Sequence, residues 1–225
     1  LGASLSFFLT GELELAYGWQ TAFMILSIGP LVGLVLILAN LPLRETVVST
    51  QTTHMFDFRP ALRNRRALAY MIAYGIHNGE SSVMRAWIVA YLVVAQAKLT
   101  SPPIFDWSPT MVATIANLLG LPAIILINEL APKLGRRNVI MFIMALSAAI
   151  GITIGLSLNA SYGLILALVL FYGVAVTADS GSINGGLVER ADPAIRGQSM
   201  AMHALFAAAA AFALPVLFGI VLDLA

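Results

Sequence analysis

Three charged side chains lie within long apolar stretches of the sequence, where a charge is costly. Glu80 and Arg85 interrupt the stretch at 67–95, and Asp179 interrupts the stretch at 162–188. Ionisable groups inside hydrocarbon usually face a bundle interior or a water-filled cavity, so all three are candidate functional residues. A desolvated carboxyl can load and release protons near neutral pH, and a guanidinium can hold a carboxylate or phosphate in a fork. The structural alternatives are a neutral Glu80 hydrogen-bonded between helices, an Arg85 that snorkels to the interface, and an Asp179 that serves as a gate or a helix contact.

Other polar side chains accompany these charges. At about 100° per residue, one helical face carries Tyr74, His77, Asn78, Ser81 and Arg85, and Glu80 lies at its edge. His77 is a candidate proton shuttle, with a plain hydrogen-bonding role as the alternative. The candidate substrate-binding or ion-coupling residues are therefore Tyr74, His77, Asn78, Glu80, Ser81, Arg85, Asp179 and Ser180.

The composition limits the class of protein that can carry these residues. The chain has 225 residues, of which 60% are hydrophobic and 10% are charged. A soluble domain carries about 25% charged residues, so there are too few charges here for a water-facing surface, and the hydrophobicity excludes disorder. A net charge of +1 gives no footprint for nucleic acid. The chain has no cysteine and three widely spaced histidines, so we expect no metal and no cofactor.

The elements that must position the candidate residues are membrane-spanning helices. A spanning helix needs about 20 mostly apolar residues, whereas barrel strands alternate polar and apolar residues over about 10. Six full spans are predicted, at 21–39, 67–95, 110–127, 139–158, 162–188 and 197–222. Residues 1–10 read as the end of a further span, so we expect a fragment of a longer protein. The predicted fold is an all-α, polytopic transmembrane helix bundle.

The basic residues predict how the bundle lies in the membrane. Ten of the twelve are placed in alternate connections: Arg44, Arg59, Arg63, Arg65, Arg66, Lys133, Arg136, Arg137, Arg190 and Arg196. The other connections hold only Lys98. Because cytoplasmic loops are enriched in Lys and Arg, the basic set is predicted to be cytoplasmic. We expect a multi-pass protein of a bacterial inner membrane, in contact with the lipid bilayer, with residues 40–66 as a cytoplasmic connector.

Polarity repeats along the predicted spans with a period of three helices. The second and fifth full spans are polar in the middle, the first and fourth are lipid-like, and the third and sixth are intermediate. A three-helix repeat is typical of transporters built from inverted repeats. It predicts that 67–95 and 162–188 line a cavity.

The segment at 128–137 reads Asn-Glu-Leu-Ala-Pro-Lys-Leu-Gly-Arg-Arg. It resembles the short cytoplasmic loop motif of the major facilitator superfamily, which joins the second and third helices of each half. The matching residues are Leu130, Lys133, Gly135, Arg136 and Arg137. Asn128 replaces the first glycine of that motif, and Pro132 replaces its aspartate, which removes the charge interactions usual for that position.

Two further segments support the same register. Residues 17–23 look like the turn between helices five and six, and residues 196–223 look like helix eleven. The resemblance therefore implies that residues 1–39 are the end of the N-terminal half, with part of helix five and helix six. Residues 67–225 would be helices seven to eleven of the C-terminal half. Helix twelve and most of the N-terminal half would lie outside this chain, and helices seven and ten would line the cavity.

The functional hypothesis is secondary active transport of a small solute by alternating access, coupled to protons or another ion. The expected partners are a small-molecule substrate, with anions among the candidates, a coupling ion, and the missing N-terminal half of the same protein. One alternative is an intramembrane hydrolase that uses Ser180 and His203, although no GxSxG element surrounds Ser180. The other is a non-transporting membrane scaffold or sensor. Among these, a transporter rather than an enzyme is predicted.

Overall fold

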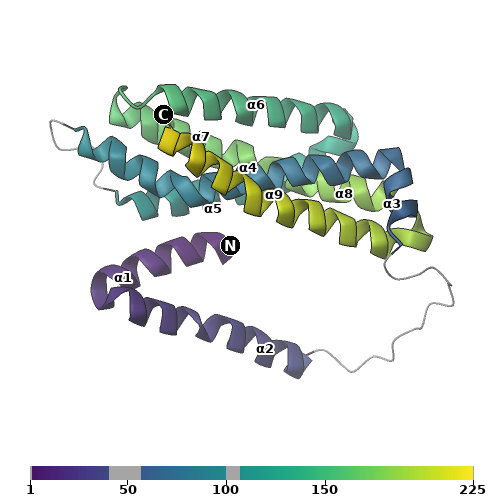
Figure 1. Cartoon of the computed structure of the whole chain (residues 1–225), viewed down its shortest axis with the longest axis horizontal. Coiled ribbons are helices and arrows are strands. Elements are labelled where there is room, and N and C mark those ends of the chain that lie inside the picture. Colours follow the sequence, from purple (N-terminus) through teal and green to yellow (C-terminus); the bar gives the residue numbers. More distant parts are fainter. Residues whose placement is uncertain (1, 41–56, 100–106, 225) are drawn as a thin grey trace.

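The structure, a computed structural model, describes residues 2–40, 57–99 and 107–224, and within them every regular element is helical (Figure 1). The elements are α1 (Gly2–Leu26), α2 (Ile28–Asn40), α3 (Arg59–Arg63), α4 (Arg65–Ala97), α5 (Pro109–Leu134), α6 (Arg136–Leu156), α7 (Tyr162–Ala178), α8 (Ser180–Arg190), a 3-10 turn η1 (Pro193–Ile195) and α9 (Arg196–Leu224). The predicted all-α class is therefore confirmed.

Within the described residues, five helical segments are long and apolar enough to cross a membrane. They are Phe8–Asn40, Pro109–Leu134, Arg136–Leu156, Tyr162–Arg190 and Pro193–Leu224. The remaining predicted span, 67–95, lies within α4, which is 33 residues long but carries Glu80 and Arg85 in its middle. The protein is thus an integral, multi-pass membrane protein, while the count of six full spans and a partial one stays a prediction.

Helix α1 turns back on itself at Gly18, and α2 follows its second part. Gly18 has φ 79° and ψ 162°, which are not helical angles, and Figure 1 shows the chain doubling back within α1. Only glycine adopts such a conformation readily, so this residue permits the turn expected at 17–23. No residue of α2 is buried in the described structure, as expected for a lipid-like span.

The segment 128–137 is not a loop, contrary to its interpretation from the sequence. Helix α5 continues to Leu134 and α6 begins at Arg136, so only Gly135 separates them. Gly135 has φ 89°, a left-handed conformation that turns the chain within one residue, so no longer connection is needed. Of the predicted connector 40–66, residues 41–56 lie outside the described residues, and the rest contains the last residue of α2, the short α3 and the first two residues of α4.

The predicted span 162–188 is interrupted at one of its candidate residues. Asp179 separates α7 from α8, with φ −85° and ψ −14°. The amide of Ile183 still donates to the carbonyl of Asp179 at 2.9 Å, so the two helices follow nearly one course. Discontinuous spans of this kind frequently mark binding sites in transporters.

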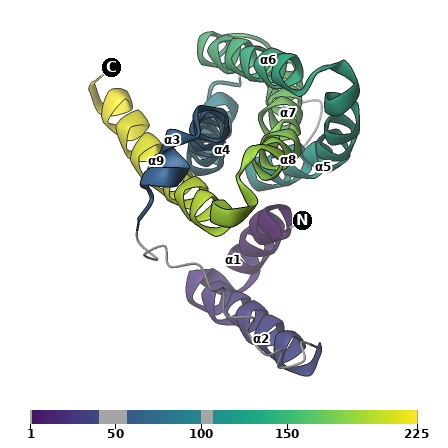
Figure 2. The ribbon, with the colours of Figure 1, turned by 90° about the vertical axis from the view of Figure 1, so that its right-hand side faces the viewer.

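Helix pairs build the bundle, and Figure 2 shows α9 beside α4, and α5 beside α7. These are also the most extensive contacts between elements. In the second pair the backbones of α5 and α7 approach closely: a Cβ on Gly173 would lie only 2.5 Å from the carbonyl oxygen of Ala116. Small residues allow this approach in membranes, where close packing rather than hydrophobic burial drives helices together.

The buried apolar side chains form two clusters, one toward each end of α4. The first includes Met84, Ile88 and Leu92 of α4 with residues of α5, α6 and α7. The second includes Ala67 and Met71 of α4 with residues of α3, α8 and α9. The candidate residues His77 and Glu80 fall between the two clusters, so the polar middle of α4 is closed off by apolar packing on both sides.

Candidate functional site

Glu80 joins three helices. The hydroxyl of Ser147, on α6, donates to Glu80 Oε2 at 3.2 Å, and the hydroxyl of Tyr172, on α7, donates to Glu80 Oε1 at 3.1 Å. Ser147 is buried, with 2% of its surface exposed. Both donors favour a charged carboxylate, while its location within the bundle disfavours the charge. Because the hydroxyl donors and the surrounding bundle act in opposite directions on the charge, Glu80 is suited to gain and lose a proton.

His77 and Asp179 form the second polar contact, between α4 and the α7–α8 break. The distance from His77 Nδ1 to Asp179 Oδ1 is 2.8 Å, and the side chains are 8% and 3% exposed. The two atoms are close enough for an ion pair. Neither atom makes a hydrogen bond of acceptable geometry with a described residue. The contact is therefore electrostatic, and it leaves both atoms able to accept a better-aligned partner.

An aromatic pair extends this group to α9. The ring of Tyr74 stacks on that of His203 with centroids 3.9 Å apart and lies 5.7 Å from the ring of His77. His203 Nε2 lies 2.8 Å from Asn184 Oδ1, on α8. Three elements are thereby held together: α4, α8 and α9.

The structure places the other predicted residues less centrally. Ser81 is buried, and its hydroxyl has no hydrogen-bond partner among the described residues. Ser180 donates to the carbonyl of Thr177 at 3.0 Å, a local helix contact. Asn78 and Arg85 are half-buried, and no hydrogen bond or ion pair joins either to the part of the chain that the structure describes. Of the eight candidates, Tyr74, His77, Glu80 and Asp179 are brought into side-chain contacts that cross helices.

Four members of this polar group were not among the predicted site residues: Ser147, Tyr172, Asn184 and His203. Tyr172 and Asn184 are polar side chains within a predicted span, and His203 enters the sequence analysis only as the histidine of the hydrolase alternative. Ser147 lies in a span without charges that was interpreted as lipid-like. A single serine in such a span has no sequence signal that separates a site residue from a helix-packing residue.

One residue of the motif at 128–137, Arg136, links α6 to α8. Arg136 donates from Nη2 to Glu189 Oε1 at 2.5 Å and from Nη1 to the carbonyl of Ser182 at 3.1 Å. Both partners belong to α8, where Gly185 leaves room for the guanidinium: a Cβ there would lie 3.0 Å from Arg136 Nη1. The motif thus retains a charged link between helix ends even though Pro132 replaces its usual aspartate.

No group of three His, Cys, Asp or Glu residues that could hold a metal ion occurs within residues 2–40, 57–99 and 107–224. The polar group instead offers carboxylates, imidazoles and hydroxyls at the middle of a helix bundle. These groups can exchange protons and bind a polar solute.

Comparison with known proteins identifies a family for the whole arrangement. A family model described as Major Facilitator Superfamily matches residues 1–216. Among curated proteins and among solved structures, no match to the chain is found.

Proposed function

The chain belongs to the major facilitator superfamily, a family of membrane transporters, and from that premise we propose secondary active transport of a small solute by alternating access, coupled to protons. We also propose the division made from the motifs. Residues 1–39 then correspond to the end of the N-terminal half, residues 40–66 to a cytoplasmic connector, and residues 67–225 to helices seven to eleven, in a bacterial inner membrane.

One observation carries the coupling proposal. Glu80 and His77 lie on the same part of α4, between two apolar clusters. Glu80 contacts α6 and α7, and His77 contacts Asp179 at the α7–α8 break. Intramembrane acids in contact with mobile helices are typical of proton relays. When the cavity opens to one side, water reaches these groups and sets their protonation. When it closes, the hydroxyls of Ser147 and Tyr172 take over the solvation of the carboxylate.

Substrate binding is assigned to the same face of α4. Arg85 is half-buried and has no described partner, so its guanidinium is free for a carboxylate or phosphate group. The hydroxyl of Ser81 is a further unsatisfied polar group on this face. These residues favour a small organic anion as the solute.

The test uses the complete gene product in liposomes that contain a pH-sensitive dye. A panel of small carboxylates, organic phosphates and amphiphilic amines is applied, and solute-induced proton movement is recorded. We expect Glu80→Gln and Asp179→Asn each to abolish this movement, because neither amide can carry the proton. Exchange of labelled for unlabelled solute, which needs no net proton flux, should persist.

Glu129→Gln is the matched control, because it removes the same charge from an exposed position on α5. It should leave proton movement unchanged. If solute transport driven by a pH gradient persists in both Glu80→Gln and Asp179→Asn, these residues have no coupling role.

The hydrolase alternative receives no support from the geometry. Ser180 donates to Thr177 within its own turn, whereas His203 contacts Asn184, so the two do not form a nucleophile–base pair. The same residues are better explained as helix contacts next to the polar group.

A further inference from the structure

His203 is a buried titratable side chain that the coupling proposal leaves unused. It is 4% exposed and lies on α9, which begins at Arg196. At 1.5 Å per residue it lies about 10 Å from the arginine-rich end of the bundle, where α4, α6 and α9 begin, whereas His77 lies about 18 Å from that end along α4. His203 is therefore placed between the His77–Asp179 pair and the end of the bundle where the arginines gather.

One ring nitrogen of His203 is held and the other is bare. The side chain of Asn184 donates from Nδ2 to the carbonyl of Ser180 at 2.9 Å, so its Oδ1 is the atom that faces His203. That oxygen lies 2.8 Å from Nε2 of His203 and can only accept, so Nε2 carries the ring hydrogen. The neutral ring then has its lone pair on Nδ1, which is buried and has no hydrogen-bond partner among the described residues.

This arrangement lets the ring take up a proton without losing its anchor. A proton that binds at Nδ1 leaves the Nε2–H bond to Asn184 in place, because a protonated imidazole donates from both nitrogens. Tyr74 and, next to it, His77 face the imidazole from α4, and the neutral Asn184 faces it from α8. The ring of Tyr74 is stacked on His203 at 3.9 Å, and aromatic faces attract cations. A proton on His203 is thus stabilised without a fixed counter-charge.

Ser199 continues the line of polar atoms toward the arginine-rich end. It lies one helical turn before His203 on the same face of α9 and is 1% exposed. Its hydroxyl has no hydrogen-bond partner within the part of the chain that the structure describes. A hydroxyl both donates and accepts, so it can pass a proton between Nδ1 of His203 and water at the end of the bundle.

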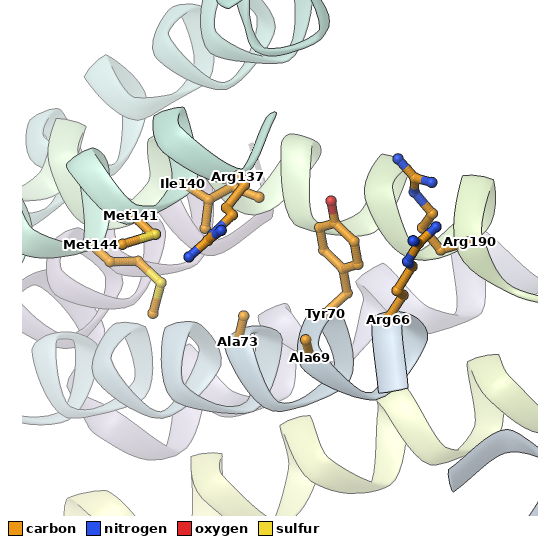
Figure 3. Close-up of a pocket in the computed structure, with 9 residues that line it drawn as sticks. All are labelled: Arg66, Ala69, Tyr70, Ala73, Arg137, Ile140, Met141, Met144 and Arg190. Carbon is orange, nitrogen blue, oxygen red and sulfur yellow. The ribbon is translucent and has the colours of Figure 1, made fainter. Parts of the chain in front are cut away.

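A second opening at the same end is less suited to a proton. A cavity of about 510 Å³ lies between α4, α6 and α8, and its lining includes Arg66, Arg137 and Arg190 (Figure 3). Figure 3 shows Arg66 and Arg190 at one side of this cavity and Arg137 beside two methionines at the other. A proton that entered would meet positive charge at both sides, which raises its free energy. The uncharged groups around His203 offer a proton the better route.

We propose that His203 carries the proton between the His77–Asp179 pair and water at the arginine-rich end, and that it does so on Nδ1. The inference rests on the proposed proton-coupled transport. When the protein opens toward this end, the proton leaves the carboxyl of Asp179 and binds the lone pair of Nδ1, which leaves a carboxylate and an imidazolium. The imidazolium then releases a proton from Nδ1 to water by way of Ser199, and the neutral ring is restored.

NMR of the complete gene product in micelles, with isotope-labelled histidine nitrogens, tests the proton carrier directly. Comparison with His203→Gln assigns the signals of this ring. We expect the neutral ring to hold its hydrogen on Nε2, and Nδ1 to change from a bare to a protonated nitrogen between about pH 5 and pH 8. A hydrogen on Nδ1 of the neutral ring would overturn the proposal, as would a ring that stays neutral over this range.

Transport measurements give a second test, in the liposome assay described above. His203→Gln should lower the initial rate of solute-induced proton movement at least about tenfold, because the amide keeps a donor for Asn184 but cannot carry a proton. Exchange of labelled solute should persist. Met202→Leu is the matched control, since it changes the neighbouring buried side chain of α9 at nearly constant volume, and its rate should stay within about twofold of wild type.

The possible failures give different results. No solute-induced proton movement in the wild type would overturn the proposed function and this inference with it. Normal movement in the wild type and an equal rate in His203→Gln would overturn the inference alone. Loss of solute exchange together with proton movement in His203→Gln would assign this residue a purely structural role, which also contradicts the inference.

Discussion

Individual charged residues of the bundle interior differ in how the protein stabilises them. Glu80 is solvated by two hydroxyls from other helices, whereas Asp179 depends on a single imidazole. Arg85 has no described partner. Hydroxyl solvation can be rearranged at little cost, but loss of His77, the one partner of Asp179 among the described residues, would leave a buried charge uncompensated.

The substitution His77→Ala should therefore destabilise the protein by about 3 kcal/mol, because it strands the carboxylate of Asp179 in the bundle. The double substitution His77→Ala, Asp179→Ala should cost clearly less than the sum of the two single changes. Unfolding titrations with dodecyl sulfate in mixed micelles give the four free energies of this cycle. Strict additivity would show that the 2.8 Å contact contributes no coupling energy.

At the scale of the helices, glycines decide which pairs pack closely. Gly173 lets α7 approach the backbone of α5, whereas nothing lies within 4 Å of the Cβ position of Gly163, at the start of the same helix. The α7–α8 break at Asp179 then places this acid opposite His77. The position of the acid thus depends on how α7 packs against α5.

Gly173→Ala should destabilise the protein by about 1–3 kcal/mol, because the added methyl would overlap the carbonyl of Ala116 and the helices would have to separate. Gly163→Ala is the matched control and should be neutral or slightly stabilising, since alanine is the better helix former. Thermal unfolding in detergent compares the two. Equal melting temperatures for both variants would mean that the close approach of α5 and α7 is not needed.

At the scale of the whole molecule, charge and apolar packing are separated along the length of the helices. Arginines gather at one end of α4, α6 and α8, and Lys98 with Asn159 lies at the other end, joined at 3.1 Å. The two apolar clusters lie between these ends, on either side of the polar group. This arrangement predicts a fixed orientation in the membrane.

These 225 residues contain no cysteine, so a cysteine introduced here can be labelled to test that orientation. A single Ala160→Cys should react with a membrane-impermeant maleimide in intact cells, because it lies at the end without arginines. Asn138→Cys, exposed at the arginine-rich end, should react only after the cells are made permeable. Labelling of Asn138→Cys in intact cells would show that the arginine bias assigns the wrong side.

The sequence alone determined the fold class and the polar helices. In lipid, the backbone N–H and C=O groups of a long, continuous apolar run can all be hydrogen-bonded only if the run forms a helix. Glu80 and Asp179 identify the spans with a polar middle, because a charge in hydrocarbon is costly. The motif residues also predicted the family that the comparison shows. These features depend on local composition and spacing, which a sequence states directly.

Only the tertiary structure decided which residues meet. The pairing of His77 with Asp179, the hydroxyls of Ser147 and Tyr172 at Glu80, and the continuation of α5 through 128–134 depend on helix rotation and on contacts between residues distant in the chain. In the sequence, a lone serine looks the same whether it faces lipid or a carboxylate. The polar residues of 128–137 indicate a loop, but the positive φ of Gly135 lets a single residue connect α5 to α6.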